Sequence, residues 1–199
     1  MKTVSMDNTN LAQIISLAAK IINQGGVVIA PFDTVYGIMA DPWNEKAIQK
    51  IFEIKNRPFS KTIGLAVPGV PELLQYVDIE VSNLDFIKSH IPGPYTFILK
   101  GIPSGISPFC VNSQTVAIRI PESELIKGIA SESTLLVAQT SANITGEKNL
   151  FSYDGLVNQF GEVLEKVDLV IDGGTVNSTG PSIIYNLTGP TPILVERGE

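Results

Sequence analysis

Cysteine and histidine are each present only once in this sequence of 199 residues, as Cys110 and His90. The lone cysteine excludes an intramolecular disulfide framework and favours a reducing compartment. The lone histidine excludes a metal site built from several histidines, and a Ser-His-Asp triad would have to use His90 itself. Because Pro92 and Gly93 follow it, we expect His90 at the C-terminal end of a helix, where a cationic side chain is favoured, and not in catalysis.

Charged residues are also scarce, at 17% of the chain, and the formal net charge is -6. This balance argues against a generally basic surface that coats nucleic acid, although a local basic patch stays open. No apolar run approaches the roughly 20 residues that span a bilayer, and the N-terminus has no signal-peptide pattern. We therefore expect a soluble, cytoplasmic protein, and 44% hydrophobic residues provide enough material for one core.

Segments with apolar residues at helical spacing alternate with short apolar runs. The helical spacing predicts helices over residues 11–22, 44–57, 71–77, 84–91, 122–131 and 155–163. The apolar runs predict strands over 27–31, 63–67, 94–99, 116–120, 135–140, 169–171, 183–186 and 193–195, with another ending near residue 40. Because the connections are irregular in length, we expect an α/β (α+β) fold with a twisted, mixed sheet of about seven strands covered by helices.

The segment Ala30-Pro31-Phe32-Asp33-Thr34-Val35-Tyr36-Gly37-Ile38 leads from an apolar strand into a polar turn. Pro31 has no N–H to donate and ends the regular ladder. Asp33 and Thr34 offer hydrogen-bonding groups, and Gly37 lets the backbone approach another group closely. These residues alone leave two interpretations open, a tight turn that satisfies its own amides or a turn that binds a ligand.

Sixteen consecutive residues from Lys46 to Lys61 hold five basic side chains and one acid, although the chain is acidic overall. Lys46 and Lys50 lie one helical turn apart, which is typical of a solvated helix face. Lys55 and Arg57 lie where the helix ends, so their side chains can converge on a bound anion. A planar guanidinium suits phosphate oxygens, but the P-loop and G-x-G-x-x-G motifs are absent, so a nucleotide here would be held in another way.

Polar side chains also interrupt or follow several predicted strands. Thr140-Ser141-Ala142-Asn143 follows an apolar run and is typical either of a ligand site at a strand end or of the N-cap of a short helix. Arg119 lies inside an apolar strand, so it needs an anionic partner, which is either a structural carboxylate or a ligand. Asp168 and Asp172 flank residues 169–171, and we interpret them as polar groups at the edge of the sheet.

Four elements occur in a fixed order: P-F-D-T-V-Y-G-I from Pro31, K-N-R-P-F-S-K from Lys55, T-S-A-N-I-T-G from Thr140, and E-R-G near the C-terminus. In this order and spacing the chain resembles the YrdC-like family, the threonylcarbamoyl-AMP synthases that start the threonylcarbamoyladenosine modification of tRNA. The resemblance spans about residues 21–198. It implies a YrdC-like fold with a concave ligand cleft, in its short form, with one domain over residues 1–199.

The resemblance also implies the roles of individual residues. The family's K-x-R and S-x-N elements hold ATP, and of these Lys55 and Arg57 are expected to be catalytic. The implied ATP-binding residues are Lys55, Arg57, Lys61, Thr115, Ser141, Asn143 and Arg197. The implied threonine-binding residues are Thr34, Arg119 and Ser182.

The implied reaction uses ATP, L-threonine and bicarbonate or CO2, and gives threonylcarbamoyl-AMP and pyrophosphate. We expect Mg²⁺ to be carried mainly by the nucleotide, without a metal site of protein ligands. Downstream threonylcarbamoyl-transferase proteins would receive the product, and no membrane partner is expected. Because the chain is acidic and its basic cluster overlaps the implied ATP site, we expect tRNA binding to be weak or indirect.

The sequence departs from the family pattern at three positions. The family usually has threonine where Phe32 stands, and S-T-[VI]-[VI]-D where Ile183 and Asn186 lie in S-I-I-Y-N. Retention of the K-x-R and S-x-N pairs favours the active branch over a paralogue without synthase activity. A non-catalytic RNA-binding protein is the alternative. A carbamoyl-transfer domain of hydrogenase maturation would need zinc fingers in the same chain, which the lone cysteine excludes.

Overall fold

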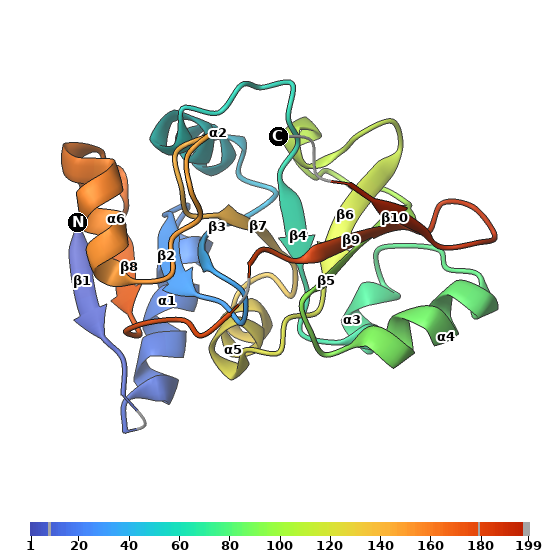
Figure 1. Cartoon of the computed structure of the whole chain (residues 1–199), viewed down its shortest axis with the longest axis horizontal. Helices are drawn as coiled ribbons and strands as arrows, with labels where there is room; N and C mark the ends of the chain where they lie inside the picture. Colours follow the sequence, from blue (N-terminus) through green and yellow to red (C-terminus); the bar gives the residue numbers. More distant parts are fainter. Residues whose placement is uncertain (8, 179, 197–199) are drawn as a thin grey trace.

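A single mixed sheet runs through the part of the chain that the computed structural model describes, which is residues 1–7, 9–178 and 180–196 (Figure 1). Its strands are β1 (Lys2–Ser5), β2 (Val28–Pro31), β3 (Tyr36–Ala40), β4 (Gly64–Ala66), β5 (Tyr95–Lys100), β6 (Thr115–Arg119), β7 (Val137–Ser141), β8 (Leu169–Asp172), β9 (Ile183–Asn186) and β10 (Ile193–Val195). In space they follow the order β1-β8-β2-β3-β7-β4-β6-β5-β9-β10. Four neighbouring pairs are parallel, namely β1/β8, β2/β8, β4/β6 and β5/β9, and the others are antiparallel. The predicted class, a mixed sheet covered by helices, is confirmed.

The described sheet has ten strands, not about seven. Strands β9 and β10 match the predicted strands over 183–186 and 193–195, and β1 is the strand for which no segment was predicted. Strand β1 reads Lys-Thr-Val-Ser and has no apolar run, so its pattern gives no strand signal. It forms because β8 offers it a parallel partner, with Lys2 opposite Leu169.

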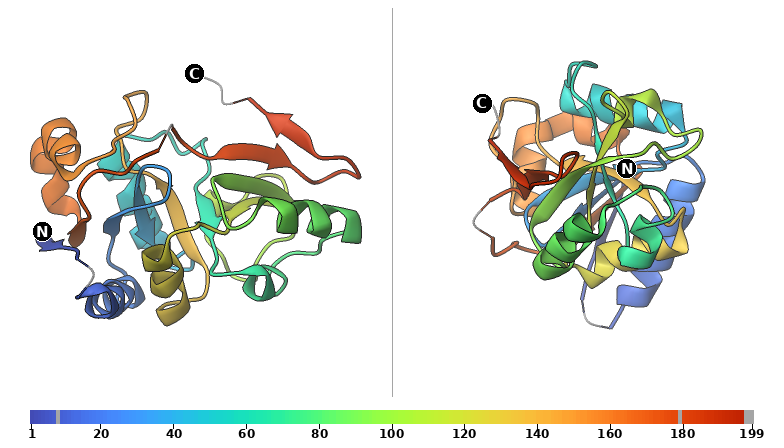
Figure 2. Two further views of the ribbon diagram at one scale, coloured as in Figure 1. Left: turned by 60° about the horizontal axis from the view of Figure 1, so that its bottom comes forward. Right: turned by 90° about the vertical axis from the view of Figure 1, so that its right-hand side faces the viewer.

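Helices cover both faces of the sheet and create two cores. The helices are α1 (Leu11–Asn23), α2 (Glu45–Lys55), α3 (Val70–Leu73), α4 (Val81–His90), α5 (Glu124–Glu132) and α6 (Tyr153–Phe160), with 3₁₀ turns η1 (Pro108–Cys110) and η2 (Gly161–Lys166). Because side chains alternate along a strand, Val28 and Met39 pack with α1 and α5, while Ile29 and Ile38 pack with α2. Figure 2 shows α1 and α5 side by side under one face.

Local signals place the helix ends. Asn44 caps α2 by accepting a hydrogen bond from the Ala47 N–H, and Asn56 ends it with φ of 47°, a left-handed conformation that asparagine tolerates. His90 is the last residue of α4, as predicted. The predicted helix over 71–77 is shorter, at Val70–Leu73. Among the described residues, no helix has the length and apolar character needed to cross a membrane.

The prediction that Asp168 and Asp172 lie at the edge of the sheet is wrong, because β1 extends the sheet beyond β8. Asp168 Oδ2 instead accepts hydrogen bonds from the Val27 N–H and from Lys50 Nζ, both at 2.7 Å. Lys50 is therefore one half of an ion pair between α2 and β8, and not simply a solvated lysine.

Candidate functional site

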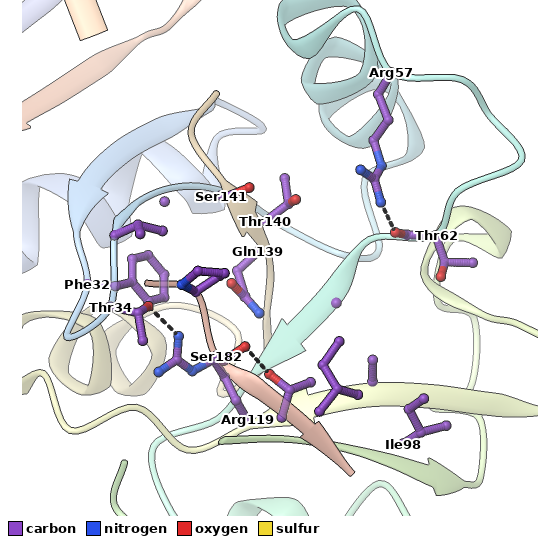
Figure 3. Close-up of a pocket in the computed structure, with 17 residues that line it drawn as sticks. Phe32, Thr34, Arg57, Thr62, Ile98, Arg119, Gln139, Thr140, Ser141 and Ser182 are labelled. Atoms are coloured by element: carbon purple, nitrogen blue, oxygen red, sulfur yellow. Dashed lines mark hydrogen bonds between the residues drawn. The ribbon is translucent and has the colours of Figure 1, made fainter. Parts of the chain in front are cut away.

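A cavity of about 310 Å³ opens at the centre of the sheet, where β3, β7, β4, β6, β5 and β9 come together (Figure 3). It is lined by Phe32, Thr34, Val35, Gly37, Arg57, Thr62, Gly64, Thr96, Ile98, Ala117, Arg119, Gln139, Thr140, Ser141, Pro181, Ser182 and Ile184. The residues of this list that the sequence predicted are Thr34, Arg57, Arg119, Ser141 and Ser182. The structure thus brings together predicted residues that are up to 148 positions apart (182 minus 34).

Strand alternation explains how the lining is built. On β6, Ala117 and Arg119 face the cavity, while Val116 and Ile118 point into the core. Sequence reasoning missed Thr62, Thr96 and Gln139, which also line the cavity, and it named Thr140 only as part of the T-S-A-N segment. An alternating pattern on β5 and β7 marks two faces of each strand, but it does not say which polar face meets a cavity.

Arg119 is held in the floor of the cavity by the turn between β2 and β3. Its Nη1 donates to Thr34 Oγ1 at 3.0 Å (Figure 3). Its Nη2 donates to both carboxylate oxygens of Asp33 at 2.8 Å. The side chains of Arg119 and Asp33 are only 3% and 12% exposed. Asp33 also accepts from the Glu122 N–H at 3.2 Å, so one carboxylate joins the turn, β6 and the segment before α5. The structural interpretation of Arg119 is confirmed by the Asp33 carboxylate, and the interpretation that it binds a ligand stays a prediction for a residue that also lines the cavity.

The ring of Phe32 packs against the guanidinium of Arg119. The guanidinium carbon of Arg119 lies 5.7 Å from the centre of the Phe32 ring. A Cβ at Gly37 would lie 2.4 Å from a Phe32 ring carbon, so only glycine leaves room for the ring. The departure from the family at Phe32 therefore changes the wall of the cavity itself.

Ser182 completes this end of the cavity from the segment before β9. Its hydroxyl lies 2.8 Å from Thr96 Oγ1 of β5, so the two hydroxyls share a hydrogen bond. Of the other two departures, Ile183 is exposed. Asn186 accepts hydrogen bonds from the N–H and hydroxyl of Thr188, at 2.9 and 2.8 Å, and fixes the turn that follows β9.

Arg57 lies at the opposite end of the cavity, in the loop after α2. Its Nη2 donates to the Thr62 carbonyl at 2.6 Å (Figure 3). Its Nε donates to the Lys61 carbonyl at 3.2 Å, so its own loop holds the guanidinium. Burial lowers the pKa of Arg57 from its ordinary value. In the part of the chain that the structure describes, no carboxylate forms an ion pair with it.

Lys55 lies behind this wall and does not line the cavity. Its side chain is 1% exposed, and its ammonium donates to the carbonyls of Ser141 and Asn143 and to Asn143 Oδ1. Removal from water, and then the charge of Arg57, lower the pKa of Lys55 to about 7. The K-x-R and S-x-N elements therefore meet as predicted, but Lys55 does so beneath the surface of the site.

The T-S-A-N segment is not an N-cap, because β7 ends at Ser141 and no helix begins before α6. Asn143 closes a turn instead, since its Nδ2 donates to the carbonyls of Ile144 at 3.0 Å and Glu147 at 2.8 Å. Its Oδ1 accepts from Ser141 Oγ at 2.6 Å. A short polar side chain that binds its own backbone competes with a helix here.

Two further predicted ATP-binding residues, Lys61 and Thr115, lie elsewhere. Lys61 is exposed and does not line the cavity. Thr115 lines a second, open depression of about 550 Å³ next to Lys100 and Thr188, although it shares the β6 face that carries Arg119. Arg197 lies outside the described residues.

No acidic side chain is among the described residues that line the 310 Å³ cavity, and no group of three or more potential metal ligands occurs elsewhere in the described ranges. A magnesium ion at this site would therefore have to take its ligands mainly from a bound polyphosphate. The cavity itself offers guanidinium, hydroxyl and amide groups, which suit anionic and polar ligands.

The chain is similar to known proteins in sequence and in fold. The family model described as "Telomere recombination", for the Sua5, YciO and YrdC proteins, matches residues 20–198. A curated relative from Methanocaldococcus jannaschii, named "Putative threonylcarbamoyl-AMP synthase", is 33% identical over 198 residues, covering 100% of this chain and 92% of that protein. The structure of P. abyssi Sua5 complexed with L-threonine is 28% identical with a TM-score of 0.85, covering 97% of this chain and 56% of that one.

The E. coli YciO structure shares the fold, with a TM-score of 0.84 at 24% identity over 99% of this chain and 94% of that chain. The chain thus spans about half the length of the Sua5 chains and nearly all of YciO. The extent of the family match and the full-length relative lead to one assignment: this chain belongs to the Sua5/YciO/YrdC family.

Proposed function

We propose that this protein is a threonylcarbamoyl-AMP synthase that joins L-threonine, bicarbonate or CO2, and ATP. The observation that carries the proposal is that a single cavity is lined by Arg57 and Ser141 at one end and by Arg119 and Ser182 at the other. The name of the M. jannaschii relative and the threonine complex of P. abyssi Sua5 support the same activity.

In the proposed reaction the amine nitrogen of threonine attacks the carbon of CO2 and loses a proton, which gives a carbamate. A carbamate oxygen then attacks the α-phosphorus of ATP, and the bond to the bridging oxygen of the β-phosphate breaks, so that pyrophosphate leaves. Both steps need the reactants held close together and the phosphate charge neutralised, more than they need a strong general base.

The residues divide between the two ends of the cavity. Thr34, Arg119 and Ser182 bind threonine, with Arg119 directed at its carboxylate. Arg57 stabilises the charge that develops on the phosphates, and Ser141 contacts ATP beside it. The family resemblance adds Lys55, Lys61, Thr115, Asn143 and Arg197 as ATP-binding residues, although Lys55, Lys61, Thr115 and Asn143 do not line this cavity. A magnesium ion bound to the nucleotide would neutralise further phosphate charge.

Pyrophosphate release is the test of this proposal. The purified protein is incubated with MgATP, with and without bicarbonate, and with single amino acids. We expect release to require both threonine and bicarbonate. Serine should be a weaker substrate by about 1–3 kcal/mol in kcat/KM, because it lacks the methyl group that an apolar wall binds.

The matched control is Lys46→Met, because Lys46 is exposed on α2 and away from the cavity, and it should leave release unchanged. Equal pyrophosphate release in the absence of any amino acid would contradict the assignment. Detection of an amino-acid-dependent adenylate by mass spectrometry would identify the product.

Binding of tRNA belongs to the same proposal as a weak or indirect contact. With 20 acidic and 14 basic residues, the chain should bind tRNA weakly at physiological salt, and ATP should reduce any binding seen at low salt. Filter binding over a salt series checks this, and the transferase proteins that accept the product are the proposed route to tRNA.

A further inference from the structure

Gln139 of β7 lies in the middle of the 310 Å³ cavity, between its two proposed substrate ends (Figure 3). It is paired with Gly64 of β4, and a Cβ on Gly64 would lie 3.3 Å from the carbonyl of Ala117 on β6, which is itself paired with Ile98 of β5. Residues that are opposite one another on neighbouring strands face the same side of a sheet. These four residues therefore form one row across the cavity floor, and Gln139 supplies the polar side chain of that row.

The neighbouring rows on either side of this one reach the two ends of the cavity. Ser141 lies two residues beyond Gln139 on β7, next to the Arg57 end. Arg119 lies two residues beyond Ala117 on β6, and because β7 and β6 run in opposite directions on the two sides of β4, it lies on the other side of the row. Two residues of a strand span about 7 Å. The Gln139 row is thus one step from the proposed phosphate contact and one step from the proposed carboxylate contact.

The side-chain amide of Gln139 is available to a ligand. The residue is half-buried, and its amide forms no hydrogen bond with any residue that the structure describes (Figure 3). Gly64 leaves room for this amide, because a Cβ there would lie 3.3 Å from Gln139 Nε2, closer than most side chains tolerate. A primary amide carries N–H donors and a carbonyl acceptor side by side. Unused donors and an unused acceptor in the wall of a cavity indicate a ligand that offers both kinds of partner.

A carbamate formed on an amino-acid amine offers this combination. The group R–NH–COO⁻ is planar, and one of its oxygens lies on the same side as its N–H. A primary amide can therefore donate to that oxygen and accept from that N–H, which leaves the second oxygen free to attack phosphorus. The ammonium of free threonine has donors only and cannot form this pair. A neutral amide also orients the carbamate without neutralising the oxygen that has to react.

We propose that Gln139 binds the carbamate of the substrate through this pair of hydrogen bonds, so that it selects the carbamate over the free amino acid and directs the free oxygen to the Arg57 end. The inference rests on the proposed function, from which it takes threonine and CO2 as substrates. Arg119 and Arg57 then hold the carboxylate and the phosphates, and Gln139 holds the group that joins them.

Binding of a stable analogue tests this pairing without requiring turnover. N-carbamoyl-L-threonine keeps the carboxylate, the N–H and the carbonyl of the carbamate, and replaces its second oxygen by an amino group. It is titrated by calorimetry into the wild type and Gln139→Met, with L-threonine as the reference ligand. We expect Gln139→Met to weaken binding of the analogue by about fivefold to a hundredfold, as the loss of two hydrogen bonds should, and to leave threonine binding within about twofold.

Gln13→Met is the matched control, because Gln13 is exposed on α1 and does not line the cavity, and it should leave both affinities unchanged. Gln139→Glu keeps the shape of the side chain but replaces the donor by a negative charge, so it should weaken the analogue at least as much as Gln139→Met. It also keeps the test decisive if Gln139→Met does not fold. Equal affinity of the analogue for the wild type and a folded Gln139 variant, or no binding of the analogue to a wild type that binds threonine, would overturn the proposal.

Kinetics tests the same role in the reaction. With threonine and MgATP saturating, the KM for bicarbonate in pyrophosphate release should rise about fivefold or more in Gln139→Met and keep its wild-type value in Gln13→Met. An unchanged KM for bicarbonate in Gln139→Met would overturn the role of Gln139 while the proposed function stands. A wild type that releases no pyrophosphate would instead overturn the proposed function, and the analogue then decides whether Gln139 binds a carbamate.

Discussion

The two ends of the cavity hold their cations in different ways. At one end, Arg119 is bound by the Asp33 carboxylate at 2.8 Å, so the protein neutralises its own guanidinium. At the other end, Arg57 in the wall and Lys55 behind it are bound by carbonyl oxygens and an amide oxygen, and no described carboxylate pairs with them.

This difference separates two kinds of anion site. A guanidinium that already has a carboxylate is fixed in orientation and is suited to one further, weakly charged group, such as the carboxylate of an amino acid. Two cations without a carboxylate leave a net positive charge in a partly buried place, which favours a polyphosphate. The same cavity can therefore distinguish its two proposed substrates by charge.

Removing Asp33 should have the largest effect on stability. Asp33→Ala leaves the buried Arg119 without its carboxylate, and breaking a buried pair costs about 3–5 kcal/mol in the free energy of unfolding. Urea unfolding measures the loss. Asp78→Ala, at an exposed carboxylate, is the control and should stay within about 0.5 kcal/mol of the wild type. A loss of similar size in both variants would remove the distinction between the two ends.

Arg57→Lys should act on turnover and leave stability nearly unchanged, because Arg57 has no buried carboxylate that depends on it. The lysine keeps the charge but loses the planar fork. Losing one preorganised donor typically costs about 2.7–4 kcal/mol, or a hundredfold to a thousandfold in rate. Pyrophosphate release and the melting temperature are measured on one preparation. A lower melting temperature with normal turnover per folded molecule would make Arg57 a structural residue.

Gly37→Ala should disturb the Arg119 end through Phe32, since the added methyl group would lie 2.4 Å from the phenylalanine ring. Forcing extra volume into a packed site costs about 1–3 kcal/mol in stability. Phe32→Ala in the same chain should remove most of this additional cost, and a double-mutant cycle measures the coupling. Additive effects would show that the ring moves aside freely.

Stability should depend on pH through Lys55. Its folded pKa of about 7 lies below the ordinary 10.5, so between these values the unfolded chain binds the proton and the folded chain releases it. The free energy of unfolding should therefore rise with pH in this window, by at most about 1.4 kcal/mol per pH unit. Urea unfolding from pH 7 to 9 should show this rise in the wild type and lose it in Lys55→Gln. Identical slopes would contradict the assignment to Lys55.

Local hydrophobic patterns were sufficient to predict the fold class, and the resemblance to the family implied that the K-x-R and S-x-N elements meet. It could not show that Lys55 is buried behind the cavity, since burial depends on how the turn after β7 packs on the end of α2. It left Asp33 without an assignment, because its partner Arg119 lies 86 positions away (119 minus 33). The sequence also did not predict strand β1, because only its pairing with the distant strand β8 makes this segment a strand.

Separate binding of the two substrates tests the account most directly. MgATP and L-threonine are titrated by calorimetry into the wild type, Arg57→Lys and Arg119→Lys, two variants that make the same change at opposite ends of the cavity. We predict that Arg57→Lys weakens MgATP binding by about tenfold or more and leaves threonine binding unchanged, and that Arg119→Lys does the reverse. Equal weakening of both ligands in either variant, or the opposite pairing, would contradict the division of the cavity into a polyphosphate end and an amino-acid end.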